Sequence, residues 1–534
     1  MLDIEEVHGD PVVDISLDTL KLNKQELVFV NTKRSAEACA EKIASKINLS
    51  DEDLFKLEEI SSKIEKVISP PTKQCKRLAR VLKKGVAFHH SGLHSKQREL
   101  VEDGFRNGSI KIICSTPTLA AGLDLPAFRV IIRDLKRFGG GGWGMSYIPV
   151  IEYEQMSGRA GRPKYDSEGQ AICLADSVED QENIWEKYVT GEAEELISKL
   201  AVEPVLRMYV LSLVATDYAN SIESLMNFMS ETFYAKQYKN MENLRFIINN
   251  IIDKLDEWKF IEAESKPAKD SSFFTSANKL KQDRKLKVTI LGARIAELYL
   301  DPFTANYLLT CMKSASSKSF NEFGLLQMIS WTLELRPRVK ARQKDMEMIE
   351  EKLILESEFL ISSEPDIYAE EYDDYLDSAK TAMVFENWIE EIPEEQILEN
   401  QNVTPGELNS KLDRADWLLY SCFELSKIQG FREVSNKILR LRIRMKNGIK
   451  EELLPLIKLK NVGRARARKL FKNKIRDLGD VKKIDVSILG AILGDKLALD
   501  IKKQVGQELS PEKLKVKPNK RKGQINLEDY DESK

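Results

Sequence analysis

The sequence of 534 residues lacks both a long apolar run and a phosphate-binding loop. No stretch of about 18 apolar residues occurs, which excludes a membrane-spanning helix. The acidic start MLDIEEVHGD is unlike a secretory signal peptide. The pattern GxxxxGK[ST], whose backbone N–H groups cradle nucleotide phosphates, is also absent. We therefore expect a cytoplasmic protein with no membrane partner and no phosphate loop of its own.

Cysteine and histidine are scarce. The six cysteines are spread over the whole length without any CxxC pair, so buried, reduced thiols are expected rather than a disulfide framework or a zinc site. Three of the four histidines lie together in FHHSGLH (88–94). A metal site would need further ligands close by, and we expect none.

The net charge of −3 points to no partner, but the charge is unevenly distributed. Residues 366–378, DIYAEEYDDYLDS, are acidic, whereas the stretch from Arg432 to Lys474 is basic. A basic block in a nearly neutral chain indicates either a surface that faces nucleic acid or a solvated helix face. Charge alone does not separate the two interpretations.

The chain is too long for one core, and its first part predicts an α/β domain over residues 1–185. Short apolar strands alternate there with helical stretches, as in a parallel sheet covered on both faces. The expected strands are 26–32, 85–90, 110–116, 128–135 and 169–176. Ligands gather at the carboxyl ends of such strands. We expect the loops after Ile113, after Leu135 and after the helix carrying Gln155 at that edge.

The rest of the chain reads as mainly helical. Residues 186–292 show helices followed by a β-ribbon, the order of a winged helix, and residues 293–438 hold long helices. Thr404, Pro405 and Glu407 form a capping box with proline at the first helical position, which predicts a helix start. Residues 439–506 predict short helices around the turn LKNVGRARARKLF, and 507–534 a disordered basic tail.

The stretch EYEQMSGRAGRPKYD (152–166) places Arg159 and Arg162 three residues apart. We expect the two guanidinium groups to share a helical face. Each is a rigid fork that matches phosphate oxygens, and arginines of this kind neutralise the charge of a departing γ-phosphate. The preceding segment CSTPTLAAGLDLPAFRVIIRD (114–134) offers small residues and Asp124, which suits a ribose hydroxyl. By itself that segment is an ordinary strand-to-helix connection.

Together these motifs resemble a known family. FVNTKRSAE, FHHSGL, TPTLAAGLDLPAFRVIIRDLKRF and QMSGRAGRPKYD resemble motifs of the second RecA-like domain of superfamily-two helicases. More narrowly, they are similar to the archaeal Ski-two-like DNA repair helicases that act at stalled replication forks. LYLDP (298–302), GELNSKLDRADWLLY and LKNVGRARARKLF resemble that family's winged-helix junction, ratchet helix and C-terminal helix-loop-helix, or helix-hairpin-helix, domain. The resemblance covers nearly the whole chain.

The resemblance implies that this chain supplies one part of a nucleotide site and that another RecA-like domain supplies the rest. Family members begin with another RecA-like domain that carries GxxxxGK[ST] and a DExH box, and neither pattern occurs here. ATP with Mg²⁺ is then expected on a separate or missing phosphate-loop subunit or domain, with no ATPase activity from this chain alone. Arg159, Arg162 and Gln155 are implied as catalytic residues, and the nucleotide is implied to lie against Gly122, Asp124 and Gly158.

The resemblance also implies a path for single-stranded or forked DNA. The loops with Thr32, Lys33 and Arg34, with His90, Ser91 and Gly92, and with Thr116 and Thr118 are implied to hold phosphates, although simple turns remain an alternative. Residues 133–153 resemble the strand-separating hairpin, with Arg137, Trp143 and Tyr147 near the DNA. The glycine run 139–142 departs from a rigid pin, so a plain surface hairpin remains the alternative.

Two further DNA contacts are implied nearer the C-terminus. Lys411, Arg414 and Trp417 are expected to face the strand from the ratchet helix, with Trp417 as a core residue the alternative. The turn with Gly463, Arg464, Arg466 and Arg468 is expected to meet phosphate. Gln524, Leu527 and Tyr530 have the spacing of a sliding-clamp-binding box, although a chance match is the more favoured reading.

The sequence thus predicts the C-terminal portion of a 3′ to 5′ DNA helicase. Two rivals remain: a non-catalytic DNA-binding remnant, and an RNA helicase of the same branch. Tolerance of the 2′-hydroxyl separates RNA from DNA binding.

Overall fold

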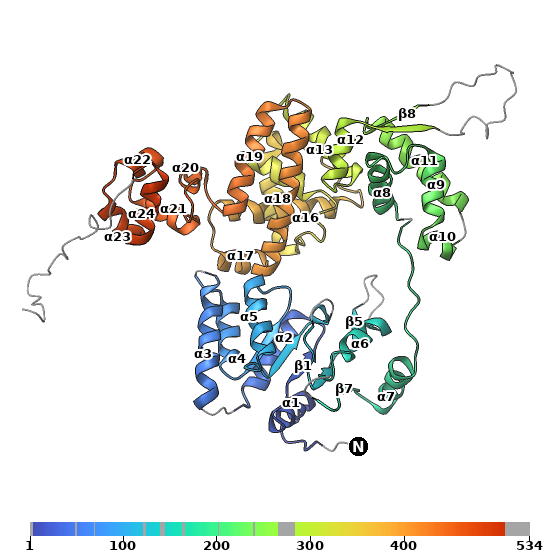
Figure 1. Ribbon diagram of the computed structural model, residues 1–534, viewed down its shortest axis with the longest axis vertical. Helices are drawn as coiled ribbons and strands as arrows, with labels where there is room; N and C mark the ends of the chain where they lie inside the picture. The colour runs from blue at the N-terminus through green and yellow to red at the C-terminus, as the bar shows by residue number, and fades with distance from the viewer. Residues whose placement is uncertain are drawn as a thin grey trace, which may run out of the picture. The chain divides into compact units, whose positions relative to one another are not determined.

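The computed structural model divides into two compact units. Figure 1 labels its helices and strands. The first comprises Met1–Thr310, Thr332–Lys340 and Pro393–Arg414, and the second Cys311–Trp331, Ala341–Ile392 and Ala415–Lys534. The structure describes residues 4–47, 51–68, 70–120, 124–138, 145–162, 166–200, 202–238, 241–264 and 284–507. No helix among them is long and apolar enough to cross a bilayer.

A five-stranded parallel sheet forms the centre of the first unit, as predicted. Its strands lie in the order β2-β3-β1-β4-β7. Strands β1 to β4 are buried along their whole length, which explains why they read as continuous apolar runs rather than as alternating patterns. The strands are β1 (Glu26–Phe29), β2 (Val86–His89), β3 (Ile112–Ser115), β4 (Arg129–Ile132) and β7 (Gln170–Cys173).

Helices cover this sheet, and one hydrophobic core joins them to it. The connection after β3 includes the short 3-10 turn η1 (Pro117–Leu119), and a short antiparallel hairpin of β5 (Lys136–Phe138) and β6 (Met145–Tyr147) follows β4. The helices are α1 (Pro11–Lys21), α2 (Lys33–Ala44), α3 (Asp51–Lys66), α4 (Lys73–Leu82), α5 (Ser95–Arg106), α6 (Val150–Ser157) and α7 (Val178–Ile184), which a π-helical turn, η2 (Trp185–Val189), extends.

The next segment of the first unit has the element order predicted for a winged helix, helices followed by an antiparallel ribbon. These elements are α8 (Glu203–Ala215), α9 (Ile222–Ser230), α10 (Phe233–Tyr238), α11 (Met241–Glu257), β8 (Ile261–Glu264), β9 (Lys285–Val288) and α12 (Ile290–Glu297). Helix α17 (Glu394–Gln401) and the start of α18 (Pro405–Ile428) also belong to this unit.

The described residues of the second unit form helices joined by loops, with no β-strand among them. Its helices include the end of α13 (Pro302–Ala315), then α14 (Glu322–Ser330), α15 (Met346–Glu356), α16 (Tyr372–Ile389), the end of α18 and α19 (Arg432–Asn447). The last helices have a hydrophobic core of their own. They are α20 (Leu454–Ile457), α21 (Arg464–Lys472), α22 (Leu478–Lys483), α23 (Val486–Leu493) and α24 (Asp495–Gln504).

Candidate nucleic-acid and nucleotide sites

The candidate nucleic-acid loops after β1, β2 and β3 lie together at the carboxyl edge of the sheet. Thr32 caps α2, because its hydroxyl oxygen accepts the Ser35 N–H at 3.0 Å. The Thr116 N–H donates to the carbonyl of His89 at 3.3 Å, so the loops after β2 and β3 are bonded to each other. The hydroxyl oxygens of Thr116 and Thr118 lie 3.0 Å apart. Thr32, Arg34 and Thr118 are exposed, whereas Thr116 is buried.

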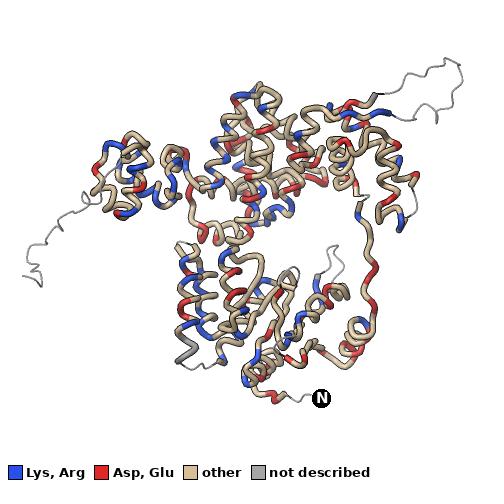
Figure 2. The backbone as a smooth tube through the Cα atoms, viewed as in Figure 1, with Lys and Arg blue, Asp and Glu red and all other residues tan. Residues whose placement is uncertain are grey.

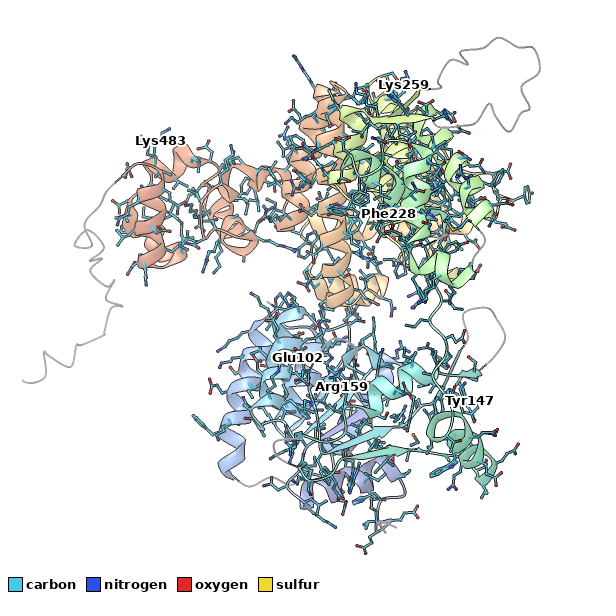
Figure 3. The ribbon with its side chains drawn as sticks, turned by 45° about the vertical axis from the view of Figure 1, so that its right-hand side comes forward. Glu102, Tyr147, Arg159, Phe228, Lys259 and Lys483 are labelled. Carbon is cyan, nitrogen blue, oxygen red and sulfur yellow. The ribbon has the colours of Figure 1, made fainter. Side chains whose placement is uncertain are left out.

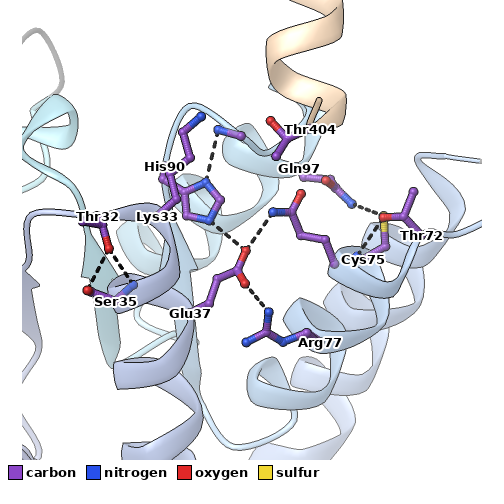
Figure 4. A network of polar contacts seen from close by, with 12 residues as sticks. Thr32, Lys33, Ser35, Glu37, Thr72, Cys75, Arg77, His90, Gln97 and Thr404 are labelled. Carbon is purple, nitrogen blue, oxygen red and sulfur yellow. Dashed lines mark hydrogen bonds and ion pairs between the residues drawn. The ribbon is translucent and has the colours of Figure 1, made fainter. Parts of the chain in front are cut away.

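The ring of His90 is buried inside the loop after β2 and is not accessible to a DNA strand. The side chain is fully buried, and it stacks on Phe88 with a centroid separation of 5.6 Å. Its Nδ1 accepts the N–H of Gly92 at 3.1 Å, and its Nε2 lies 3.3 Å from Glu37 Oε1 (Figure 4). The ring of His90 is therefore used inside the loop, and nucleic-acid binding by the loop of His90, Ser91 and Gly92 stays a prediction. His90 shapes the loop that presents the exposed Ser91.

Sequence reasoning missed the side chain of Glu37, which contacts this loop through His90. Glu37 also accepts a hydrogen bond from Gln74 Nε2 at 2.8 Å and pairs with Arg77 (Figure 4). Burial raises the pKa of Glu37, but the bonds from His90 and Gln74 and the charge of Arg77 outweigh burial, so the pKa lies below its ordinary value. The ionised carboxylate fixes His90 Nε2 as the protonated nitrogen.

Helix α18 begins directly on the loop after β2. The Gly406 N–H donates to the carbonyl of Gly92 at 3.0 Å. A Cβ at Gly406 would lie 2.2 Å from the Ser91 carbonyl oxygen, so glycine permits the approach. The predicted helix start is confirmed, because Glu407 accepts the Thr404 N–H at 3.0 Å. Glu407 also forms an ion pair with Lys33, which follows β1.

Farther along α18, two basic side chains reach one loop of the same unit. Lys411 Nζ donates to the carbonyl of Pro337, and Arg414 Nη1 donates to the carbonyl of Arg336 at 2.7 Å. Burial lowers the pKa of Lys411 from its ordinary value. Trp417 is half-buried on the part of α18 assigned to the second unit. Lys33, Ser91, Lys411 and Arg414 thus lie on or beside the first turns of α18, although they come from three distant sequence segments.

The hairpin after β4 is anchored at its base. Lys136 of β5 lies directly opposite Tyr147 of β6. Both contact the carboxylate of Asp180, at 2.5 Å from Lys136 Nζ and 2.6 Å from the Tyr147 hydroxyl. The Lys136 ammonium also lies 4.7 Å from the centre of the Tyr147 ring, so this ring takes part in the packing of the hairpin. Arg137 pairs with Glu152 at 2.9 Å, and Trp143 lies outside the described residues.

The loop after α6 lies at the amino edge of the sheet, which corrects its expected position at the carboxyl edge. The Ala127 N–H donates to the Arg159 carbonyl at 2.9 Å, and the Gly161 N–H donates to the Ala127 carbonyl at 2.7 Å. Ala127 precedes β4, so this loop meets the amino end of the sheet. A helix between parallel strands runs antiparallel to them and returns the chain to the edge where each strand begins. Figure 3 labels Arg159 in the first unit.

Arg159 and Arg162 do not share a helical face, because α6 ends at Ser157 and Gly161 takes a φ of 92°. The Arg159 guanidinium donates to the Ala120 carbonyl, from Nη2 at 2.6 Å, and its Nη1 lies 3.9 Å from Asp124 Oδ1. The Arg159 side chain retains 24% of its exposure, and that of Asp124 retains 96%.

Arg162 is held more firmly than Arg159. Its Nε donates to Asp166 Oδ2 at 2.7 Å, and its Nη1 donates to Gln25 Oε1 at 2.7 Å. The pairing lowers the pKa of Asp166. Arg162 would therefore have to leave a buried carboxylate before it could reach a nucleotide. Gln155 and Gly158 are exposed at the end of α6, and Gly122 lies outside the described residues.

The basic turn of the last helices is largely paired internally. Arg468 binds Glu391, from Nη2 at 2.6 Å, and Glu452, from Nη2 at 2.9 Å. Arg464 lies over the ring of Trp388, 5.1 Å from its centre. Gly463, at the N-cap of α21, and Arg466 are exposed.

Acidic residues also accompany the wider basic block from Arg432 to Lys474 (Figure 2). Arg442 pairs with Asp416, and Arg444 with Glu322 and Glu390. Internal pairing thus accounts for part of the block's charge. Gln524, Leu527 and Tyr530 lie outside the described residues.

Comparison with known proteins identifies two helicase segments. Residues 57–164 match the helicase conserved C-terminal domain, and residues 323–448 match domain 4 of archaeal helicases. Three similar relatives each bear the name ATP-dependent DNA helicase Hel308. The one from Pyrococcus horikoshii is 37% identical over 516 residues, the one from Methanocella arvoryzae 36% over 505, and the one from Methanococcus vannielii 34% over 538.

These matches extend over nearly all of the chain and about two thirds of each relative. They cover 95%, 94% and 96% of this chain and 67%, 65% and 69% of the relatives, respectively. The parallel sheet and the helical remainder agree with the two matched segments. The chain therefore belongs to the Hel308 family of archaeal helicases.

Proposed function

We propose that this chain forms the strand-binding and arginine-supplying part of an ATP-dependent 3′ to 5′ DNA helicase that acts in repair at replication forks. ATP with Mg²⁺ is held by a phosphate-loop RecA-like domain, since the 534 residues contain no such loop. The names of the relatives support the helicase activity and the choice of DNA. In this proposal the carboxyl edge of the sheet binds the DNA strand, and the amino edge faces the nucleotide.

One observation carries the strand-binding half of this proposal. Cationic side chains from the loop after β1 and from α18 converge in one unit, where α18 also contacts the loop after β2. Lys33, Lys411 and Arg414 are donors suited to phosphate oxygens, which every nucleic-acid sequence presents alike. Such a surface binds the backbone of a strand without reading its bases.

The test is strand binding by the chain itself, measured by fluorescence anisotropy with a labelled single-stranded DNA. Removing both Lys411 and Arg414 by alanine substitution is expected to weaken binding at least tenfold and to make the salt dependence shallower. The control Lys63→Ala removes an exposed cation of α3 that pairs with Glu59, and it should leave the affinity unchanged. Equal binding by the double variant and the unmodified chain would refute the assigned surface. Preference for RNA of the same sequence would favour the RNA helicase.

For the nucleotide-binding part of the proposal, we assign the contact with the γ-phosphate to Arg159 in preference to Arg162. Arg159 is bound mainly by a carbonyl and stays partly exposed, whereas Arg162 is held by a carboxylate. When the chain is combined with a phosphate-loop RecA-like domain of the family, DNA-stimulated ATP hydrolysis is expected. Arg159→Ala should reduce that rate by about a thousandfold or more, as for other arginine fingers. Hydrolysis that survives without Arg159 contradicts its role, and a combination that never hydrolyses ATP favours the non-catalytic remnant.

A further inference from the structure

The two carboxylate oxygens of Glu407 bind different partners. Oε2 accepts the Thr404 N–H at 3.0 Å and the Thr404 hydroxyl at 2.8 Å, which caps the start of α18. Oε1 pairs with the ammonium of Lys33 (Figure 4 shows Lys33 and Thr404). Glu407 therefore stays fixed by the helix start even when Lys33 leaves it.

Glu407 is an anion beside several cations of the proposed strand-binding surface. Lys411 lies one turn farther along α18, where burial lowers its pKa; repulsion from Arg414 and Lys33 acts in the same direction, and attraction by Glu407 opposes it. The side chains of Lys33 and Glu407 retain 34% and 39% of their exposure, so water and a strand can reach both. A carboxylate in this position meets the same donors that a phosphate would meet.

We propose that the Glu407 carboxylate pairs with Lys33 in the absence of DNA, and that a phosphate of an entering DNA strand replaces it. This inference rests on the proposed strand-binding function and adds the residue that sets its strength. Lys33 suits the exchange, because its ammonium is a point charge on a flexible stem with three rotatable donors. Each strand phosphate that arrives must compete with Glu407, which weakens binding and favours release.

The test uses Glu407→Gln in the full chain. The amide oxygen of glutamine can still accept from Thr404, so the helix cap is kept while the charge that holds Lys33 is removed. We expect the variant to bind single-stranded DNA more tightly, by up to about fivefold, the range of a half-exposed ion pair. Lys33→Met should weaken binding, and the double variant should bind no more tightly than Lys33→Met alone. Circular dichroism should show an unchanged helix content.

A matched control removes the same charge elsewhere in the first unit. Glu399 of α17 pairs with Lys73 at the start of α4, which is not one of the cations of the proposed DNA-binding surface, and Glu399→Gln should leave the affinity unchanged. The inference is overturned if Glu407→Gln binds no better than the unmodified chain, if the gain persists without Lys33, or if Glu399→Gln gives the same gain. An unmodified chain that binds no single-stranded DNA would overturn the proposed function as well, so the two failures are distinguishable.

Discussion

Replacing Glu26 by glutamine should remove a pH dependence that the first unit carries in its core. Glu26 lies at the start of β1 and is fully buried against α1. Its carboxylate accepts from the hydroxyls of Ser16 and Thr19, each at 2.5 Å. Arg129 donates to Thr19 at 2.7 Å and pairs with Asp18 at 2.9 Å. This group of side chains fastens α1 to the sheet.

The magnitude follows from the pKa of Glu26, which burial raises from 4.5 to about 7 against the opposing bonds from Ser16 and Thr19. Because the pKa is raised in the folded state, the contribution of Glu26 to stability is complete below pH 4.5 and is lost as the pH rises through about 7. At about 1.36 kcal/mol per pKa unit, the whole loss is about 3 kcal/mol. About 1 kcal/mol of it falls between about pH 6 and pH 8.

Hydrogen exchange of peptides that cover α1 and β1 measures the free energy of opening this region without requiring the whole chain to unfold in one step. After correction for intrinsic exchange rates, the opening free energy of the unmodified chain relative to Glu26→Gln should fall by about 1 kcal/mol between about pH 6 and pH 8. Glutamine stays neutral at both values. A difference between the two proteins that does not change with pH, or that grows in favour of Glu26, would refute the reasoning.

Three further changes have expected outcomes. Gly406→Ala places a Cβ 2.2 Å from the Ser91 carbonyl oxygen, so α18 should shift from its loop, and anisotropy should show weaker strand binding, by about tenfold. Asp180→Asn, which removes the negative charge at the hairpin base, should speed hydrogen exchange in β5 and β6 while leaving exchange in the five-stranded sheet unchanged. Asp301→Asn removes the buried carboxylate that pairs with the buried Arg207 and leaves it with the more exposed Glu203, so the change should cost about 3 kcal/mol, read as a lower melting temperature.

The sheet was predictable because its strands carry their information locally. Residues 26–29 and 112–115 are short apolar runs between helical stretches, and such runs indicate buried parallel strands wherever they occur. The start of α18 was predictable for the same reason, since Thr404, Pro405 and Glu407 are neighbours in sequence.

The partners of each side chain could not be predicted in this way, because they lie far away in the sequence. His90 stood out in sequence as a loop residue, yet its burial depends on Glu37, 53 residues earlier, and on Phe88 beneath it. Lys33 meets Glu407 across 374 residues. No periodicity or motif in one sequence records such a pair, so the residues at the site were predictable as candidates while their partners were not.

The separation of the two candidate sites determines how they can influence each other. The Arg159 backbone lies by the amino end of β4 and Lys33 by the carboxyl end of β1, with buried strands of four residues, about 13 Å of backbone, between the two edges. The Arg159 guanidinium also reaches the Ala120 carbonyl in the connection after β3. A packed parallel sheet transmits displacement as one body rather than by local deformation. A force applied at Arg159 therefore moves the loops after β1 and β2 together. The start of α18 must follow, because Gly406 and Glu407 are bonded to those loops. Lys411 and Arg414 would then move with the sheet. In the proposed function, a nucleotide bound at Arg159 would in this way displace a DNA strand bound at Lys33, Lys411 and Arg414.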